Sequence, residues 1–152
     1  MKTYRVAAFI LMLLLIGVTG CSVQNLEARL VPGSDLSPQA SYYVIRHEQD
    51  SRSIDVTIAK QLKTMGLRNI SSGPEINKPN DTNIIVLYED RWMWDITNYL
   101  IFLKIQFRDA ESNLLLARGK SYRTSLVRKS VDEMVQETLV AIFNTNKGEV
   151  QK

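Results

Sequence analysis

The sequence predicts an α+β domain: a two-layer sandwich with two helices packed on one face of a mixed, mainly antiparallel sheet of four to five strands. Three observations indicate this class. Two segments repeat apolar residues at helical spacing, and several short runs are rich in β-branched and aromatic residues. The order is strand, helix, further strands, helix. Two amphipathic helices that covered only each other would leave the strands without a core.

The first strand and helix are predicted near the start of this domain. Residues 41–46 (SYYVIR) are rich in tyrosine, valine and isoleucine, as is typical of a strand. The next apolar residues recur every three or four positions and predict one helical face: Ile54, Ile58, Leu62 and Met65. Asp50 or Ser51 stands where an N-cap belongs, and Gly66 stands where a left-handed C-cap belongs.

The middle of the chain predicts a short strand, a loop and a central strand. Residues 67–70 favour the short strand, and prolines and glycine in residues 71–82 favour the loop. Residues 83–88 (NIIVLY) are apolar without alternation. Such a run predicts a central strand that is covered on both faces.

A hairpin is predicted next. Residues 97–108 alternate, so we expect one core face made of Tyr99, Ile101, Leu103, Ile105 and Phe107. Residues 109–113 then form a turn, and residues 114–122 return as the partner strand.

The last helix begins at a predicted capping box, because Ser130 and Glu133 have the required spacing. Its apolar face consists of Met134, Val135, Leu139, Ile142 and Phe143. We expect it to end near residues 144–146, so that the globular domain spans residues 41–146 and residues 147–152 form a frayed tail.

The first twenty residues have the features of a secretory signal peptide. Lys2 and Arg5 precede an apolar run over residues 6–18, and small residues follow it. This run is shorter than the ~20 apolar residues that a membrane-spanning helix needs. The alternative is a plain signal peptide or membrane anchor followed by a buried structural cysteine, Cys21.

The sequence Val18-Thr19-Gly20-Cys21 resembles the lipobox of bacterial lipoproteins. The resemblance implies cleavage before Cys21, a diacylglycerol on its sulfur and an acylated amino group, so that the acyl chains hold the protein on a membrane. Ser22 in place of aspartate implies, by the same resemblance, the periplasmic face of the outer membrane. We expect residues 21–40 to form the lipidated cysteine and a tether, from which Leu26, Leu30 and Leu36 can dock on the domain.

Composition excludes several classes of function. Without Lys2 and Arg5, 17 basic residues face 16 acidic ones, which gives a net charge of +1. This balance, together with export, argues against a nucleic-acid partner. With Cys21 used by the anchor and His47 the one histidine, we expect no disulfide, metal site or cofactor, and no enzymatic activity.

The globular part loosely resembles small bacterial lipoproteins of the domain-of-unknown-function type 4136. The matching segments are residues 50–54 (DSRSI) with the helix to Gly66, the strand within 81–88, residues 103–109, and residues 115–119 (LLARG). This resemblance covers about residues 41–143. It implies the fold, and no activity.

Residues 88–95 (YEDRWMWD) contain both tryptophans and are the first candidate site. In an extended chain one face carries Tyr88, Asp90, Trp92 and Trp94, and the other carries Glu89, Arg91, Met93 and Asp95. Aromatic rings beside acids suit a protein partner or a glycan. The alternative is that one or both tryptophans cap the core while Arg91 pairs with an acid. The same acids are weaker candidates for a cation site or a carboxylate pair.

The second candidate site is a cationic stretch. Arg118, Lys120 and Arg123 are candidates for contacts with anionic headgroups, and the alternative is a solvated sheet face. Arg118, Lys120 and Tyr122 share one strand face.

The sequence thus predicts a non-enzymatic, lipid-anchored envelope protein, a scaffold or accessory factor on the periplasmic face of the outer membrane. Its partners are the membrane, through Cys21, and an envelope protein or glycan. The alternative is a small glycan- or lipid-binding module of the envelope.

Overall fold

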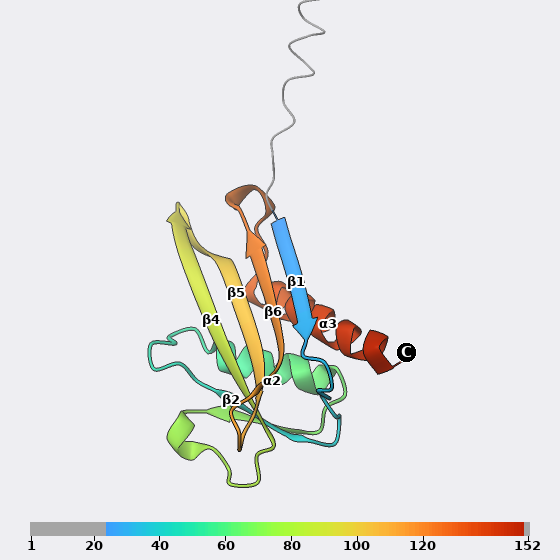
Figure 1. The fold of residues 1–152 in the computed structure, drawn as a ribbon. Helices are drawn as coiled ribbons and strands as arrows, with labels where there is room; N and C mark the ends of the chain where they lie inside the picture. Colours follow the sequence, from blue (N-terminus) through green and yellow to red (C-terminus); the bar gives the residue numbers. More distant parts are fainter. Residues whose placement is uncertain (1–23, 151–152) are drawn as a thin grey trace, which may run out of the picture.

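The computed structural model describes residues 24–150, with side chains described for residues 24–145 (Figure 1). It confirms the predicted class: an α+β fold in which two helices pack against a mixed sheet. The sheet has six strands in the order β1-β6-β5-β4-β2-β3. The predicted signal peptide and Cys21 lie outside the described residues.

The parallel part of the sheet is built around the first helix. Strand β2 (Ser41–Ile45) is parallel to both β3 (Asn69–Gly73) and β4 (Ile84–Asp95). Helix α2 (Ile54–Thr64) is the crossover between β2 and β3. A single turn of 3-10 helix, η1 (Glu75–Asn77), lies in the loop before β4.

The predicted N-cap is off by a few residues, because the N-cap position of α2 is Ser53 and not Asp50 or Ser51, whereas Gly66 follows the helix end as predicted. The Asp50 carboxylate accepts the backbone N–H groups of Arg52 and Ile54, each at 2.7 Å. At the other end, Gly66 has φ +98°. The backbone N–H of Leu67 reaches the carbonyl of Leu62 at 3.3 Å, which completes a Schellman motif and ends the helix.

The antiparallel part of the sheet is a meander of β4, β5 (Thr97–Asp109) and β6 (Leu115–Arg123). A β-bulge interrupts the pairing of β4 with β5, because Arg91 pairs with Phe102 and Trp92 pairs with Leu100. Ile101 is therefore the extra residue, and the side-chain alternation changes phase there. Leu100 is buried in its place.

The predicted core face of this strand is consequently right on one side of the bulge and wrong on the other. Leu103, Ile105 and Phe107 are fully buried. Tyr99 and Ile101 are only half-buried. The aromatic contacts of the core centre on Phe107, whose ring meets Tyr42 and Phe143 edge-on at 6.1 and 5.8 Å.

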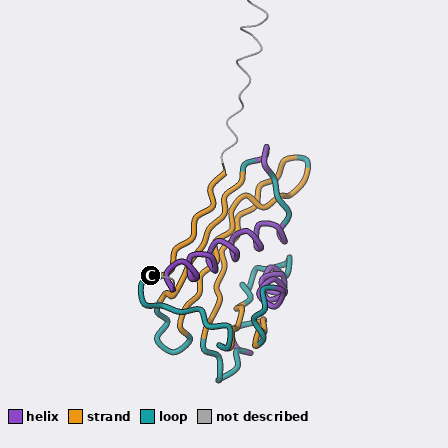
Figure 2. Tube along the Cα trace, turned by 90° about the vertical axis from the view of Figure 1, so that its right-hand side faces the viewer, coloured by secondary structure: helices purple, strands orange, loops and turns teal. Residues whose placement is uncertain are grey.

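The prediction that β4 is covered on both faces is wrong. Its core-facing residues Ile84, Val86 and Tyr88 are buried, whereas Ile85 and Leu87 are half-buried. The physical reason is that the buried residues of α2 and α3 (Val131–Val150) belong to one core cluster on a single side of the sheet (Figure 2). Among residues 24–150, no helix lies on the opposite side of the sheet.

The prediction of a tether over residues 21–40 is wrong for most of that segment. Gln24–Leu30 forms β1, an edge strand antiparallel to β6 from the pair Gln24–Arg123 to the pair Leu30–Ala117. Leu30 and Leu36 are buried in the core. The described part of the domain therefore already includes Gln24, and its sheet has six strands where four to five were expected.

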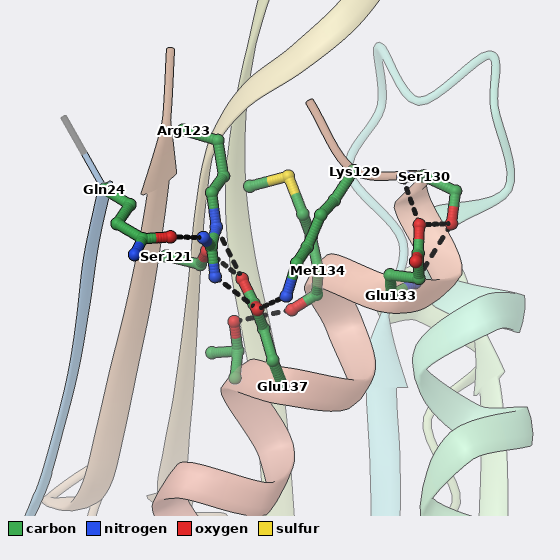
Figure 3. A network of polar contacts seen from close by, with 9 residues as sticks. Gln24, Ser121, Arg123, Lys129, Ser130, Glu133, Met134 and Glu137 are labelled. Atoms are coloured by element: carbon green, nitrogen blue, oxygen red, sulfur yellow. Dashed lines mark hydrogen bonds and ion pairs between the residues drawn. The ribbon is translucent and has the colours of Figure 1, made fainter. Parts of the chain in front are cut away.

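The predicted capping box opens α3. The backbone N–H of Ser130 donates to the Glu133 carboxylate at 2.8 Å, and the Glu133 N–H donates back to the Ser130 hydroxyl at 3.3 Å (Figure 3). The apolar face is as predicted, since Met134, Val135, Leu139 and Ile142 are fully buried. The helix continues to Val150, beyond the expected end and into the segment that was expected to fray.

Candidate functional site

The long β4–β5 hairpin ends in an exposed apolar tip. Ile96 is the single residue between the two strands, and its side chain is 88% exposed. Its φ is +61°, in the left-handed region that a β-branched residue rarely adopts. Trp94 is 72% exposed and Met93 is 49% exposed. The hairpin thus holds large apolar side chains in solvent at the cost of a strained turn.

A second exposed segment lies at the same end of the molecule. It is η2 (Ser125–Val127), in which Leu126 is 73% exposed. Arg128 joins it to the hairpin, because its guanidinium donates to Asp95 at 2.8 Å and lies 4.0 Å from the centre of the Tyr99 ring. Figure 1 shows the hairpin tip, η2 and the start of β1 together at the upper end, and Figure 2 agrees. We call the exposed apolar residues here the tip surface: Met93, Trp94, Ile96 and Leu126.

The two tryptophans have different environments. The Trp92 indole N–H donates to the Asp90 carboxylate at 2.6 Å, and the Arg52 guanidinium lies 4.0 Å above its ring. Trp92 also packs against the core. Of the two interpretations of this stretch, core capping therefore describes Trp92, and an exposed surface describes Trp94.

The remaining residues of this stretch are also divided. Arg91 pairs with Glu89 at 3.4 Å and stacks 4.5 Å from the Phe102 ring, so it pairs with an acid as one interpretation expected. Tyr88 is buried. Its hydroxyl donates to Asp50 at 2.6 Å, and burial and this hydrogen bond raise the pKa of Tyr88. Tyr88 thus stabilises the start of α2 and contributes no exposed surface.

The predicted cationic stretch is split between the two faces of the sheet. Arg123 lies on the helix side and is buried, with its guanidinium on both carboxylate oxygens of Glu137 at 3.1 and 2.6 Å (Figure 3). It also donates to Gln24. Its predicted role in headgroup contact is therefore wrong, because strand alternation turns it inward.

Glu137 is the centre of this network. Burial opposes its charged form, but hydrogen bonds from Arg123, Lys129 and Ser121 hold the pKa of Glu137 below its ordinary value of 4.5. Through Gln24, the network ties the first residue of β1 to α3 and β6. It fixes the position of the strand that follows Cys21.

Arg118 and Lys120 lie on the open face of the sheet, as predicted. Lys120 pairs with Glu27 at 3.0 Å, and Lys104 pairs with Glu89 at 2.5 Å. Arg118 stands directly opposite Arg29. Within residues 24–145, neither arginine has an ion pair. These strands border a shallow groove of about 670 Å³, lined in part by Arg29, Lys104, Arg118 and Lys120.

Two properties of the described residues bear on function. They contain no group of three or more histidine, cysteine or acidic side chains with the geometry of a metal site. None of the helices in residues 24–150 is both long enough and apolar enough to span a bilayer.

The described residues form a small α+β domain in which two helices cover one side of a mixed sheet. This fold is similar to that of PelC from Paraburkholderia phytofirmans. A crystal structure of a PelC variant dodecamer matches with a TM-score of 0.61 at 12% identity, over 78% of this chain and 97% of that one. A second crystal form of the dodecamer matches with a TM-score of 0.60 at 10% identity, over 79% and 98%.

Sequence comparisons add nothing to this likeness. No model of a known protein family matches the chain, and no curated protein matches it. The resemblance to lipoproteins of the domain-of-unknown-function type 4136 therefore has no support from a family model. The similarity to PelC concerns the fold.

Sequence reasoning missed several residues of this end of the molecule. Ile96 and Leu126 were not singled out, because neither belongs to a periodic pattern. Gln24 was assigned to the tether, although Leu26, Ala28 and Leu30 alternate with polar residues at the spacing of a strand. Glu137 lies on a helix where acids are ordinary, so nothing in the sequence distinguishes it.

Proposed function

We propose that this protein is a non-enzymatic, lipid-anchored scaffold or accessory factor on the periplasmic face of the outer membrane. The observation that carries the proposal is the combination of a lipobox ending at Cys21 with a fold similar to that of PelC, an outer-membrane lipoprotein. Acyl chains on Cys21 hold the domain at the membrane surface.

The proposed partners are copies of the same chain or another envelope protein. PelC forms a dodecamer, and similarity over most of both chains makes self-assembly the first arrangement to test. The open face of the sheet and the edge strands β1 and β3 are the surfaces available for such contacts.

The lipid anchor is tested by metabolic labelling with an alkyne fatty acid and mass spectrometry of the mature chain. The wild type should carry label, fractionate with the outer membrane and begin at an acylated Cys21. Cys21→Ser should lose the label and membrane retention while keeping its melting temperature. Label on the Cys21→Ser variant, or a bare amino terminus on the wild type, would refute the proposal.

Self-assembly is tested on the detergent-solubilised, acylated protein by native mass spectrometry. Discrete multiples of the protomer mass should appear at micromolar concentration. If native mass spectrometry shows only monomers, and chemical crosslinking in intact cells also yields no multiple of the protomer mass, self-assembly is refuted. The scaffold proposal would then require another envelope protein as the partner.

A glycan-binding module is the second candidate, favoured by Arg29 and Arg118 beside the groove of about 670 Å³. Paired guanidinium groups suit carboxylate-bearing sugars. Calorimetric titration with a uronate oligosaccharide tests it: binding that Arg118→Gln abolishes would favour this candidate over the scaffold.

A further inference from the structure

We propose that the tip surface (Met93, Trp94, Ile96 and Leu126) inserts into the headgroup region of the membrane that carries the lipid anchor. The proposal rests on the proposed lipidation of Cys21. It adds a second, non-covalent contact with the same bilayer and thereby fixes how the domain stands on it.

The position of the anchor is the first argument. Two residues, Ser22 and Val23, separate Cys21 from Gln24, and the three residue steps between Cys21 and Gln24 span at most about 10 Å. Gln24 starts β1 at the same end as the hairpin tip and η2 (Figure 1). The pairing of β1 with β6 and the bond from Arg123 to Gln24 fix that strand in the domain. An acylated Cys21 therefore brings this end of the domain against the lipid.

The chemistry of the tip surface is the second argument. A tryptophan at the end of a hairpin suits the interface between water and acyl chains, where an indole has both an apolar ring and a polar N–H. Ile96 occupies a left-handed turn position where glycine or asparagine has no strain. An isoleucine that is 88% exposed in such a position buries little apolar area in the described structure, and an apolar medium would bury more.

The charges near the tip do not oppose this contact. The one acid in residues 93–97 is Asp95, and Arg128 neutralises it at 2.8 Å. Residues 124–130 contain no acid. Arg91 and Arg128 balance Glu89 and Asp95, so these paired charges present no net negative charge that anionic headgroups would repel.

This orientation changes which cations meet the headgroups. Arg118 lies opposite Arg29, about 17 Å along β1 from Gln24 at 3.3 Å per residue. That separation is about twice the Debye length at physiological ionic strength. The headgroup contact expected of Arg118 is thus replaced by contact through the tip surface, and the part of the groove beside Arg29 and Arg118 stays free in the periplasm. Lys120 stands opposite Glu27, about 10 Å along β1 from Gln24, which is about one Debye length.

The test uses the full, acylated protein with a single tryptophan. Trp92→Phe leaves Trp94 as the only indole, and the protein is reconstituted into vesicles of phosphatidylcholine and phosphatidylglycerol with or without brominated acyl chains. We expect bromine near the headgroups to quench Trp94 fluorescence at least twofold. Trp94→Phe, which leaves Trp92, should be quenched much less.

A matched pair of variants in the Trp92→Phe background locates the contact. Ile96→Asp should lower the quenching of Trp94 by at least half. Leu114→Asp should leave it unchanged, because Leu114 is also exposed but lies in the β5–β6 turn at the opposite end. Equal loss in both variants would indicate non-specific adsorption and overturn the proposal.

Mass spectrometry of the same samples separates the two proposals. An acylated Cys21 without quenching of Trp94 would overturn the tip contact, leave the proposed function intact and make the tip surface a site for a protein partner. Absence of acyl mass would overturn the proposed function, and the tip contact with it.

Discussion

The Arg123 guanidinium donates two hydrogen bonds to the Glu137 carboxylate, at 3.1 and 2.6 Å, and both side chains are almost buried. The pair thereby joins β6 to α3, next to Gln24, the first residue of β1. We expect this pair to contribute more to stability than the ion pairs on the open face of the sheet, because water weakens those exposed pairs.

Glu137→Gln should destabilise the domain by about 3 kcal/mol, because it leaves Arg123 buried beside an uncharged amide. Urea denaturation followed by circular dichroism measures the free energy of unfolding. Glu27→Gln is the control, because its pair with Lys120 is exposed to water and its loss should change stability much less than the loss of Glu137. Equal losses in the two variants would contradict the importance of burial.

Stability should fall in acid. Glu137 has a lowered pKa in the folded protein, so the unfolded chain binds its proton more readily. Its stabilisation is complete above the ordinary value of 4.5 and is lost as the pH falls through that value toward the lowered pKa. Unfolding free energies measured between pH 7 and 3 should therefore decline less in Glu137→Gln than in the wild type. Parallel curves would show that Glu137 is not responsible.

Ile96→Asn should stabilise the domain by about 1 kcal/mol, because asparagine tolerates the left-handed turn and isoleucine does not. Thermal denaturation in the absence of membranes measures this gain. Ile76→Asn is the control: Ile76 is equally exposed in η1 but has no positive φ, so its replacement should change stability by less than about 0.5 kcal/mol. A loss of stability in Ile96→Asn would mean that the turn is not strained.

The bulge predicts a sharp difference between two neighbouring positions. Leu103→Asp should prevent folding, because it buries an unpaired charge in the core. Ile101→Asp should fold with a modest loss of about 1 kcal/mol, because Ile101 is the half-buried extra residue. Near-ultraviolet circular dichroism distinguishes the two outcomes, and an unfolded Ile101→Asp protein would contradict the register.

Gly119 of β6 packs tightly against α3. A Cβ atom there would lie 2.7 Å from Cγ1 of Ile142. Gly119→Ala should therefore destabilise the domain by about 1–3 kcal/mol. Ile142→Ala makes room, so the double variant should lose less than the sum of the two single changes. Additive losses in urea denaturation would contradict this contact.

Where local signals agree with the fold, the sequence was sufficient. Asp50 accepts a hydrogen bond at the start of α2, and Gly66 follows the end of that helix. Ser130 and Glu133 form the capping box of α3, and the apolar spacing of both helices predicts their buried faces. These features depend on residues within one or two turns of each other. They can be recognised without knowing what packs against them.

The sequence-based predictions were wrong where residues far apart in the sequence determine the structure. The bulge at Ile101 follows from pairing with β4, and strand β1 forms because β6, almost a hundred residues later, offers a free edge. The inward position of Arg123 likewise depends on Glu137 from another element. The sequence alone does not decide which tryptophan is exposed, because Trp92 and Trp94 differ only in the residues that pack around them in the folded protein.

The short distance between Cys21 and β1 has a consequence for assembly. Once acylated, neighbouring copies would lie at the same distance from the membrane and in the same orientation. They could then meet only by lateral diffusion in the plane of the membrane. The outer edges of β1 and β3 would then meet sideways at matching levels, at a local concentration far above that in the surrounding fluid. A long flexible segment between the anchor and β1 would remove that restriction.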